Sequence, residues 1–135
     1  MAVASKPKSK YGNRHTLTCL RCSGTAISLD RICISCGGDV LHLFDSKAES
    51  ARYAQLHWWR KAKQISNLVV QPEYPIEVAG VVVGKCIADF SYTDNEGHHI
   101  VEDIKGGNAT DTAISKFKRK CVVAQYGINI QVVRR

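Results

Sequence analysis

The spacing of apolar side chains predicts two helices in the later two-thirds of the chain. Residues 45–63 begin with Asp45, and Ser46-Lys47-Ala48-Glu49 follows, which fits a capping box whose serine and glutamate satisfy amides of the first turn. Residues 111–126 end at Gly127, which suits the left-handed C-terminal cap of a helix. Each segment carries one apolar stripe at helical spacing: Tyr53, Leu56 and Trp59 in the first, and Ile114, Phe117, Cys121 and Ala124 in the second.

Runs of β-branched and aromatic residues predict strands around the second helix. Two short runs, residues 69–70 and 76–78, flank a Gln-Pro-Glu-Tyr-Pro segment. Longer runs occupy residues 81–92, with a break expected at Gly84, and residues 99–105 and 128–133. Asp94-Asn95-Glu96-Gly97 is typical of the turn of a hairpin. The resulting order is helix, three strands, helix and strand, which indicates an α/β fold.

The first 43 residues follow a different pattern. Residues 1–15 contain basic but no acidic side chains and predict a flexible basic arm. Residues 16–43 hold four of the six cysteines. We therefore expect three parts, namely the arm at 1–15, a small cysteine module at 16–43 and an α/β core at 44–135.

The cysteine module contains two Cys-x-x-Cys pairs separated by ten residues: Cys19 with Cys22, and Cys33 with Cys36. Each pair brings two thiolates to one side of a tight turn, and two pairs supply the four soft ligands of tetrahedral zinc. We predict a structural Zn²⁺ ribbon, since four protein ligands leave no position for a substrate. A redox pair, two disulfides or unligated thiols are the alternatives. Disulfides are disfavoured because no secretion signal is evident.

Composition narrows the class of protein. The chain has 135 residues, of which 44% are hydrophobic and 23% charged, as in globular proteins. No apolar run approaches the roughly 20 residues that span a bilayer, so we expect a cytoplasmic protein without membrane contact. The formal net charge is +7. Four thiolates and one Zn²⁺ would change it by −4 and +2, to about +5, and this excess favours a polyanionic partner such as nucleic acid.

Two aspartates and a lysine form a candidate catalytic set. Asp103 and Lys105 share one face of the strand at 99–105, and Glu102 lies on the opposite face. If the preceding hairpin is centred on Glu96, paired residue numbers sum to 192 and Asp89 faces Asp103. Like charges across a strand pair are destabilising, so a cation between them is expected. Mg²⁺ held by carboxylates can activate water for phosphodiester hydrolysis; the alternative is a surface ion pair between Asp103 and Lys105.

Other side chains have two interpretations each. Glu49 is either the glutamate of the capping box or a third acidic metal ligand, because it shares a helix face with Tyr53. One of Trp58 and Trp59 is expected in the core, and the other could stack on a base or lie at a dimer interface. His98 and His99 are expected at a solvated hairpin end. The basic run of the second helix is either a solvated face or a phosphate track: Lys116, Lys118, Arg119 and Lys120.

Several segments together resemble a known superfamily. Ile87-Ala88-Asp89-Phe90 and Val101-Glu102-Asp103-Ile104-Lys105-Gly106 resemble the PD-(D/E)xK nuclease signature, with Ala88 in place of the proline. The predicted α-β-β-β-α-β order matches the core of that superfamily. The chain is also similar to a small phage family related to Holliday-junction resolvases. The similarity lies in five segments: Lys10–Arg14, Phe44–Tyr53, Ile65–Leu68, Gln71-Pro72 and Ala124–Gly127.

The resemblance implies a central mixed sheet and a metal-dependent DNA endonuclease. It makes Asp89 and Asp103 ligands of catalytic Mg²⁺ or Mn²⁺, Lys105 the catalytic lysine and Glu49 the helix acid, with Gln125 a weaker candidate. It implies that the substrate is branched DNA, with a four-way junction as the first candidate. It also implies a homodimer that acts in DNA recombination, in the cytoplasm of the bacterial host if the protein is phage-encoded. The expected DNA contacts are Lys10, Arg14, Lys116, Lys118, Arg119 and Lys120. The alternatives are a partner-dependent nuclease subunit of transposase type and an inactive zinc-ribbon DNA-binding protein.

Overall fold

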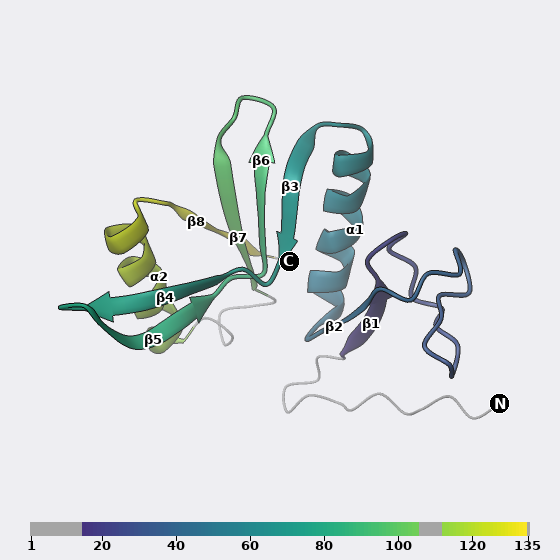
Figure 1. The fold of residues 1–135 in the computed structure, drawn as a ribbon, viewed down its shortest axis with the longest axis horizontal. Helices are drawn as coiled ribbons and strands as arrows, with labels where there is room; N and C mark the ends of the chain where they lie inside the picture. The colour runs from purple at the N-terminus through teal and green to yellow at the C-terminus, as the bar shows by residue number, and fades with distance from the viewer. Residues whose placement is uncertain (1–14, 106–111, 135) are drawn as a thin grey trace. The chain divides into compact units, whose positions relative to one another are not determined.

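A computed structural model describes residues 15–105 and 112–134 of the chain (Figure 1). The chain divides into two compact units, Met1–Lys61 and Ala62–Arg135, and each is described by itself. In the described part of the chain, no helix is both long enough and apolar enough to cross a membrane. Lys10 and Arg14, expected to contact DNA, lie outside the described residues.

The first unit contains a two-stranded sheet and one helix. Strands β1 (Thr16–Cys19) and β2 (Leu41–Phe44) pair antiparallel and enclose the cysteine loops. Helix α1 (Lys47–Lys61) begins as the capping box predicts: the Glu49 amide donates to Ser46 Oγ at 3.2 Å, and the Glu49 carboxylate accepts from the Asp45 amide at 3.3 Å.

Helix α1 packs against the cysteine module. The Tyr53 hydroxyl donates to the Leu20 carbonyl in the first cysteine loop, and the hydroxyls of Ser50 and Thr18 lie 2.8 Å apart. The ring of Tyr53 also packs against Phe44 of β2, with centroids 5.6 Å apart. These contacts join α1 to the strands around the cysteines, so the division falls after Lys61 and differs from the boundary at 43/44 that the sequence predicts.

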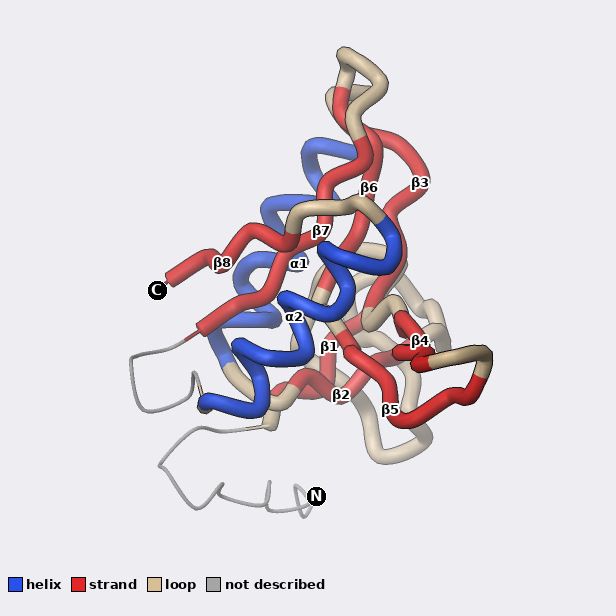
Figure 2. The backbone as a smooth tube through the Cα atoms, turned by 90° about the vertical axis from the view of Figure 1, so that its left-hand side faces the viewer, coloured by secondary structure: helices blue, strands red, loops and turns tan. Residues whose placement is uncertain are grey.

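The second unit is built on a mixed four-stranded sheet with the order β3-β6-β7-β8. Strands β3 (Ile65–Val70), β6 (Phe90–Asp94) and β7 (His99–Lys105) are successively antiparallel. Strand β8 (Ile130–Arg134) pairs parallel to β7, and helix α2 (Ala113–Tyr126) forms the crossover between them (Figure 2). The fold is therefore α/β with a mixed sheet, as predicted.

The remaining strands form a separate hairpin. Strands β4 (Glu73–Val78) and β5 (Val81–Ile87) pair with each other and extend away from the four-stranded sheet as an arm (Figures 1 and 2). The predicted strand at 81–92 is thus two strands, and the break falls at residues 88–89 rather than at Gly84. Gly84 lies within β5, opposite Ile76 and beside a shift of register. Among the described residues between the two helices there are five strands rather than the predicted three.

The arm, the sheet and α2 share one hydrophobic core. Its buried members are Ile76, Cys86, Ala88, Val101, Val122 and Ile130. Helix α2 is capped as predicted, because Gly127 adopts a φ of 67° and donates to the Val123 carbonyl. Its predicted stripe is only partly correct: Val122 is buried, whereas Ile114 and Phe117 are 69% and 66% exposed. The helix packs on β4 and β5, which cover the side that bears Val122.

Candidate metal centre and candidate active site

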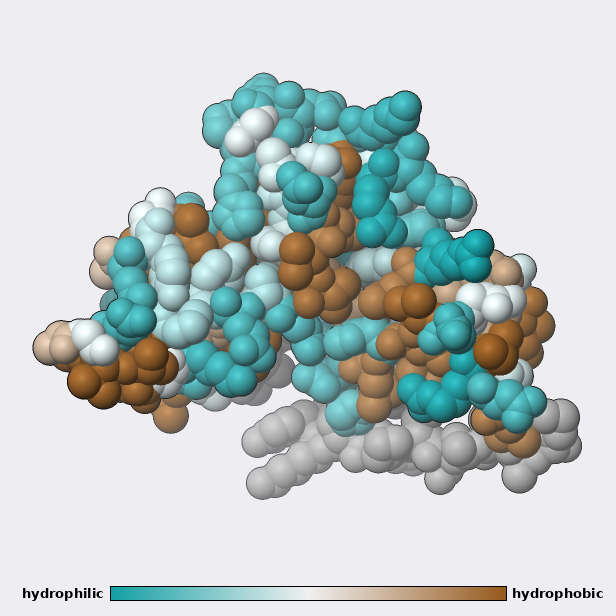
Figure 3. All heavy atoms as spheres, in the orientation of Figure 1, coloured by the Kyte–Doolittle hydropathy of each residue, from teal (hydrophilic) through white to brown (hydrophobic). Residues whose placement is uncertain are grey.

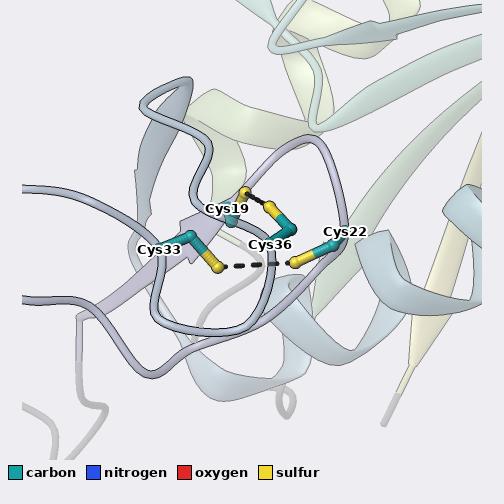
Figure 4. Close-up of side chains that lie close together, drawn as sticks. All are labelled: Cys19, Cys22, Cys33 and Cys36. Carbon is teal, nitrogen blue, oxygen red and sulfur yellow. Dashed lines mark hydrogen bonds between the residues drawn. The ribbon is translucent and has the colours of Figure 1, made fainter.

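Four cysteine sulfurs meet in the first unit (Figure 4). The Sγ atoms of Cys19, Cys22, Cys33 and Cys36 all lie within 4.8 Å of one another. The closest pairs join the two Cys-x-x-Cys sequences, with 3.6 Å between Cys19 and Cys36 and 3.5 Å between Cys22 and Cys33. A disulfide needs about 2.05 Å, and all four are free. Ligands at about 2.3 Å around a tetrahedral ion lie roughly 3.8 Å apart, so the cluster fits one metal ion such as zinc.

The two loops that present the sulfurs have the same local structure. In each loop an amide two residues beyond a cysteine donates to its sulfur, from Gly24 to Cys22 at 3.3 Å and from Gly38 to Cys36 at 3.4 Å. Gly37 adopts a positive φ of 74°, as expected for a turn of this kind. A Cβ atom at Gly24 would lie 3.1 Å from Cys22 Sγ and 3.3 Å from Cys33 Sγ. The backbone therefore approaches the sulfurs too closely for a larger residue.

The surroundings of Cys33 and Cys22 change the pKa values of these two thiols in opposite directions. The Cys36 amide lowers the pKa of Cys33 to about 7, although burial opposes it, so this thiol is partly ionised at neutral pH. For Cys22 the Gly24 amide lowers the pKa, but burial and the neighbouring thiols raise it to about 12 overall. Four crowded thiols cannot all ionise without a cation, and a bound metal ion supplies that charge.

The second candidate site lies in the second unit, where β6 begins and the antiparallel strand β7 ends. The predicted register is confirmed from Thr93 opposite His99 to Phe90 opposite Glu102, and every pair sums to 192. Beyond Phe90 the pairing changes, because the Asp89 amide donates to the Glu102 carbonyl at 3.0 Å. Asp89 Oδ2 accepts from the Ile104 amide at 2.6 Å. The Asp89 carboxylate therefore lies against the peptide bond that follows Asp103.

Asp103 is held by two cations. Lys105 Nζ lies 3.3 Å and Arg119 Nη1 3.2 Å from its Oδ2, and each of the three side chains is only 13–14% exposed. Ser115 Oγ binds both cations, accepting from Lys105 at 3.3 Å and from Arg119 at 3.0 Å. Glu102 points the other way, where its carboxylate accepts from Tyr92 at 2.5 Å. The expectation that Asp103 projects with Lys105 and without Glu102 is confirmed.

A pocket of about 360 Å³ opens beside this network. Asp103 and Lys105 line it together with Ser115 and Lys118 of α2 and Lys85 of β5. A second hollow of about 450 Å³ lies along α2, between Lys116, Arg119 and Lys120 and the residues that lead into β8. The basic run of α2 therefore borders both hollows, which suits a polyanion.

Two predicted site residues make other contacts in the structure. Glu49 belongs to the first unit and acts there in the capping box of α1. Gln125 holds the backbone of β4, since its Oε1 accepts from the Glu77 amide at 2.9 Å and its Nε2 donates to the Pro75 carbonyl at 3.2 Å. Because ten residues of helix separate Gln125 from Ser115, about 15 Å along the axis, the structure does not bring Gln125 to Asp103. Gln125 instead binds the backbone of β4 and so holds the arm against α2.

Sequence reasoning missed the role of Ser115 and underrated that of Arg119. Arg119 was expected to contact DNA, but in the structure it binds Asp103 directly. The two residues are one helical turn apart, so their common face was predictable. What the sequence did not indicate is which face of α2 lies towards β7.

The described chain is thus an α/β protein with a mixed sheet, a four-cysteine cluster and a separate carboxylate–cation network. It belongs to the family described as "Protein of unknown function (DUF1064)", whose model matches residues 39–134. The match covers α1 and every element of the second unit but begins after Cys36. No curated protein and no solved structure matches the chain.

Proposed function

We propose that this protein is a metal-dependent DNA endonuclease of the PD-(D/E)xK type. The observation that supports this most directly is the grouping of three side chains where β6 begins and β7 ends. The Asp89 carboxylate binds the Ile104 amide, and Asp103 and Lys105 line a pocket beside the basic helix α2. Without the β4–β5 arm, the order α1-β3-β6-β7-α2-β8 is the α-β-β-β-α-β order that the sequence resemblance implies.

The donor set fits a divalent cation of the Mg²⁺ class. Carboxylate oxygens are its preferred ligands, and such an ion keeps several waters, for which the pocket beside Asp103 has room. We assign Asp89 and Asp103 as its ligands. Bound there, Mg²⁺ or Mn²⁺ would polarise a phosphate and lower the pKa of water.

Lys105 and Arg119 have distinct roles in this proposal. Ser115 and Asp103 hold the Lys105 ammonium inside the pocket, where it can orient the attacking water or stabilise developing negative charge. Arg119 neutralises Asp103, and its guanidinium can turn to a phosphate when the carboxylate binds metal. Asp89, Asp103, Lys105 and Arg119 have a formal charge of zero together, so added Mg²⁺ makes the site attractive to DNA.

We assign Zn²⁺ to the four-cysteine cluster, in a structural role. The supporting observations are the mutual proximity of the four sulfurs, all within 4.8 Å of one another, and the burial of Cys19 and Cys33, which are 0% and 1% exposed. A catalytic zinc would keep one position for water. Here four sulfurs fill the coordination sphere.

The proposed substrate is branched DNA, with a four-way junction as the first case, and the proposed assembly is a homodimer, because resolving a junction needs two incisions. The arm offers surface for a second copy: Val78, Val81, Val82 and Val83 are each about 60% exposed. Hydrophobic residues gather at its free end (Figure 3). A two-stranded hairpin is only marginally stable alone, so a partner that covers these valines would stabilise the arm.

Cleavage by matched carboxylate variants tests the proposal. Labelled branched DNA is incubated with Mg²⁺ and the wild type, Asp103→Asn or Asp94→Asn. Asp94 is a control because it lies at the distant hairpin turn, where it binds the amides of Glu96 and His98. We expect cleavage by the wild type and Asp94→Asn, and a loss of at least about 100-fold in Asp103→Asn, as for removal of one catalytic electrostatic group.

Two results would contradict the proposal. Equal cleavage by Asp103→Asn would place the catalytic site elsewhere. Tight binding without cleavage in Mg²⁺ or Mn²⁺ would instead favour an inactive DNA-binding protein or a nuclease subunit that needs a partner, and adding the partner would separate those two.

A further inference from the structure

Helix α1 exposes both tryptophans of the chain. Trp58 is 58% and Trp59 37% exposed, and the full sequence contains no other tryptophan. The expectation that one of them packs in the core is therefore not met, because Tyr53, Leu56 and His57 occupy the buried side of α1. Large aromatic side chains are usually mostly buried, so two adjacent exposed indoles call for a functional reason.

Cationic side chains hold these rings in place. The Arg52 guanidinium carbon lies 5.0 Å from the Trp59 ring centroid, and Lys61 Nζ lies 5.5 Å from that of Trp58. His57 meets Trp58 edge-on, with centroids 5.3 Å apart and planes at 73°. Both indoles are thus oriented by neighbours on the same helix, and each carries a positive charge beside it.

Along α1 itself, the side chains beside the tryptophans are basic, and none is a large exposed aliphatic residue. From Ser50 to Lys61 the helix has no acidic residue, and its last turn holds Arg60 and Lys61. Its one large aliphatic residue, Leu56, is buried. A protein-docking face of this size would present aliphatic neighbours around the aromatic anchors. Aromatic rings bordered by cations instead match the surfaces that bind single-stranded nucleic acid, where bases stack and phosphates meet Lys and Arg.

We propose that Trp58 and Trp59 form a stacking surface for unpaired bases of DNA, with Arg52, Arg60 and Lys61 contacting the adjoining phosphates. This inference deepens the proposed nuclease function and rests on it, since it identifies the substrate as branched DNA with unpaired nucleotides, as in a flap or a junction whose central base pairs are opened. It assigns a binding site to the first unit, whereas the proposed catalytic carboxylates belong to the second.

Binding measurements without added Mg²⁺ test this site independently of cleavage. The probes are a labelled oligothymidine and a blunt duplex of the same length, and the protein is the full chain. Because both tryptophans lie on α1, their emission reports on this surface alone. We expect the oligothymidine to quench it and the duplex to quench it much less.

Two substitutions separate stacking from simple burial. Trp58→Leu keeps an apolar side chain but removes the ring, so oligothymidine binding should weaken about 5- to 150-fold, the range for one stacked base. Trp58→Phe keeps a ring and should retain most of the affinity. Duplex binding should change little in either variant, and equal melting temperatures would confirm that both fold.

Unquenched emission together with unchanged oligothymidine affinity in Trp58→Leu would overturn the inference. So would a change of oligomeric state in Trp58→Leu with DNA affinity intact, because the surface would then be a contact between copies of the chain. Neither result depends on catalysis, so a protein that binds as expected but never cleaves would contradict the proposed nuclease function alone.

Discussion

Replacing Cys33 by serine should remove the metal and unfold the first unit. Cys33 is 1% exposed, and its sulfur lies 3.5 Å from that of Cys22. Among the described residues of this unit, five apolar side chains are buried, and two of them, Cys19 and Cys33, belong to the cluster. The unit therefore has little core to hold it once the cluster is lost.

The size of the effect follows from the coupling of metal binding to folding. Structural zinc contributes about 10–16 kcal/mol of apparent binding free energy at neutral pH, whereas the free energy of unfolding of a whole domain is about 5–15 kcal/mol. The loss is thus as large as the entire stability of the unit. The Tyr53 hydroxyl bond to the Leu20 carbonyl should be lost with the loop, and α1 should loosen with it.

Metal content and thermal unfolding measure this directly. The wild type should carry about one zinc, as four thiolate ligands require, and Cys33→Ser should carry none. Both tryptophans lie on α1, so the unfolding transition followed by their emission should disappear or move far lower in the variant. Cys121→Ser is the matched control, because Cys121 lies on α2 outside the cluster. A wild type without metal, or an unchanged transition in Cys33→Ser, would refute the reasoning.

Four further outcomes are expected. Gly24→Ala should weaken zinc binding, measured by competition with a chromophoric chelator, because its Cβ would crowd two sulfurs; Gly84→Ala, which meets nothing within 4 Å, should not. Gly127→Ala should lower the free energy of unfolding by about 1–2 kcal/mol in denaturant titrations, since φ is 67° there. Val82→Glu should shift the sedimentation of the protein towards monomer, and an unchanged dimer would exclude the arm as the contact. The affinity for junction DNA should fall with salt at a log–log slope of about −0.9 per neutralised phosphate, whereas a flat response would remove the electrostatic argument.

The local signals in the sequence were sufficient for the hairpin and the helix ends. The Asp94–Gly97 turn fixed the register of β6 and β7, since a turn determines which residues pair, and Gly127 marked the end of α2. From that register followed the common face of Asp103 and Lys105. These features depend on residues close together in the chain.

Features that depend on distant packing were not predictable in the same way. The run from Val81 to Tyr92 has strand character throughout. The alternation of its side chains does not indicate that its first part, β5, pairs with β4 and that its last part, β6, pairs with β3. The exposure of Ile114 and Phe117 has the same origin, because the arm determines which side of α2 is covered. Gln125 resembles an active-site residue in sequence, yet its amide binds the backbone of that arm.

The assay that tests the central claim most directly compares a labelled four-way junction with a linear duplex of matched sequence in Mg²⁺, using the wild type and Asp103→Asn. The proposed function predicts paired, symmetric cuts in the junction by the wild type and none by the variant. Absence of cuts in both DNAs, or the same cuts by Asp103→Asn, would contradict it.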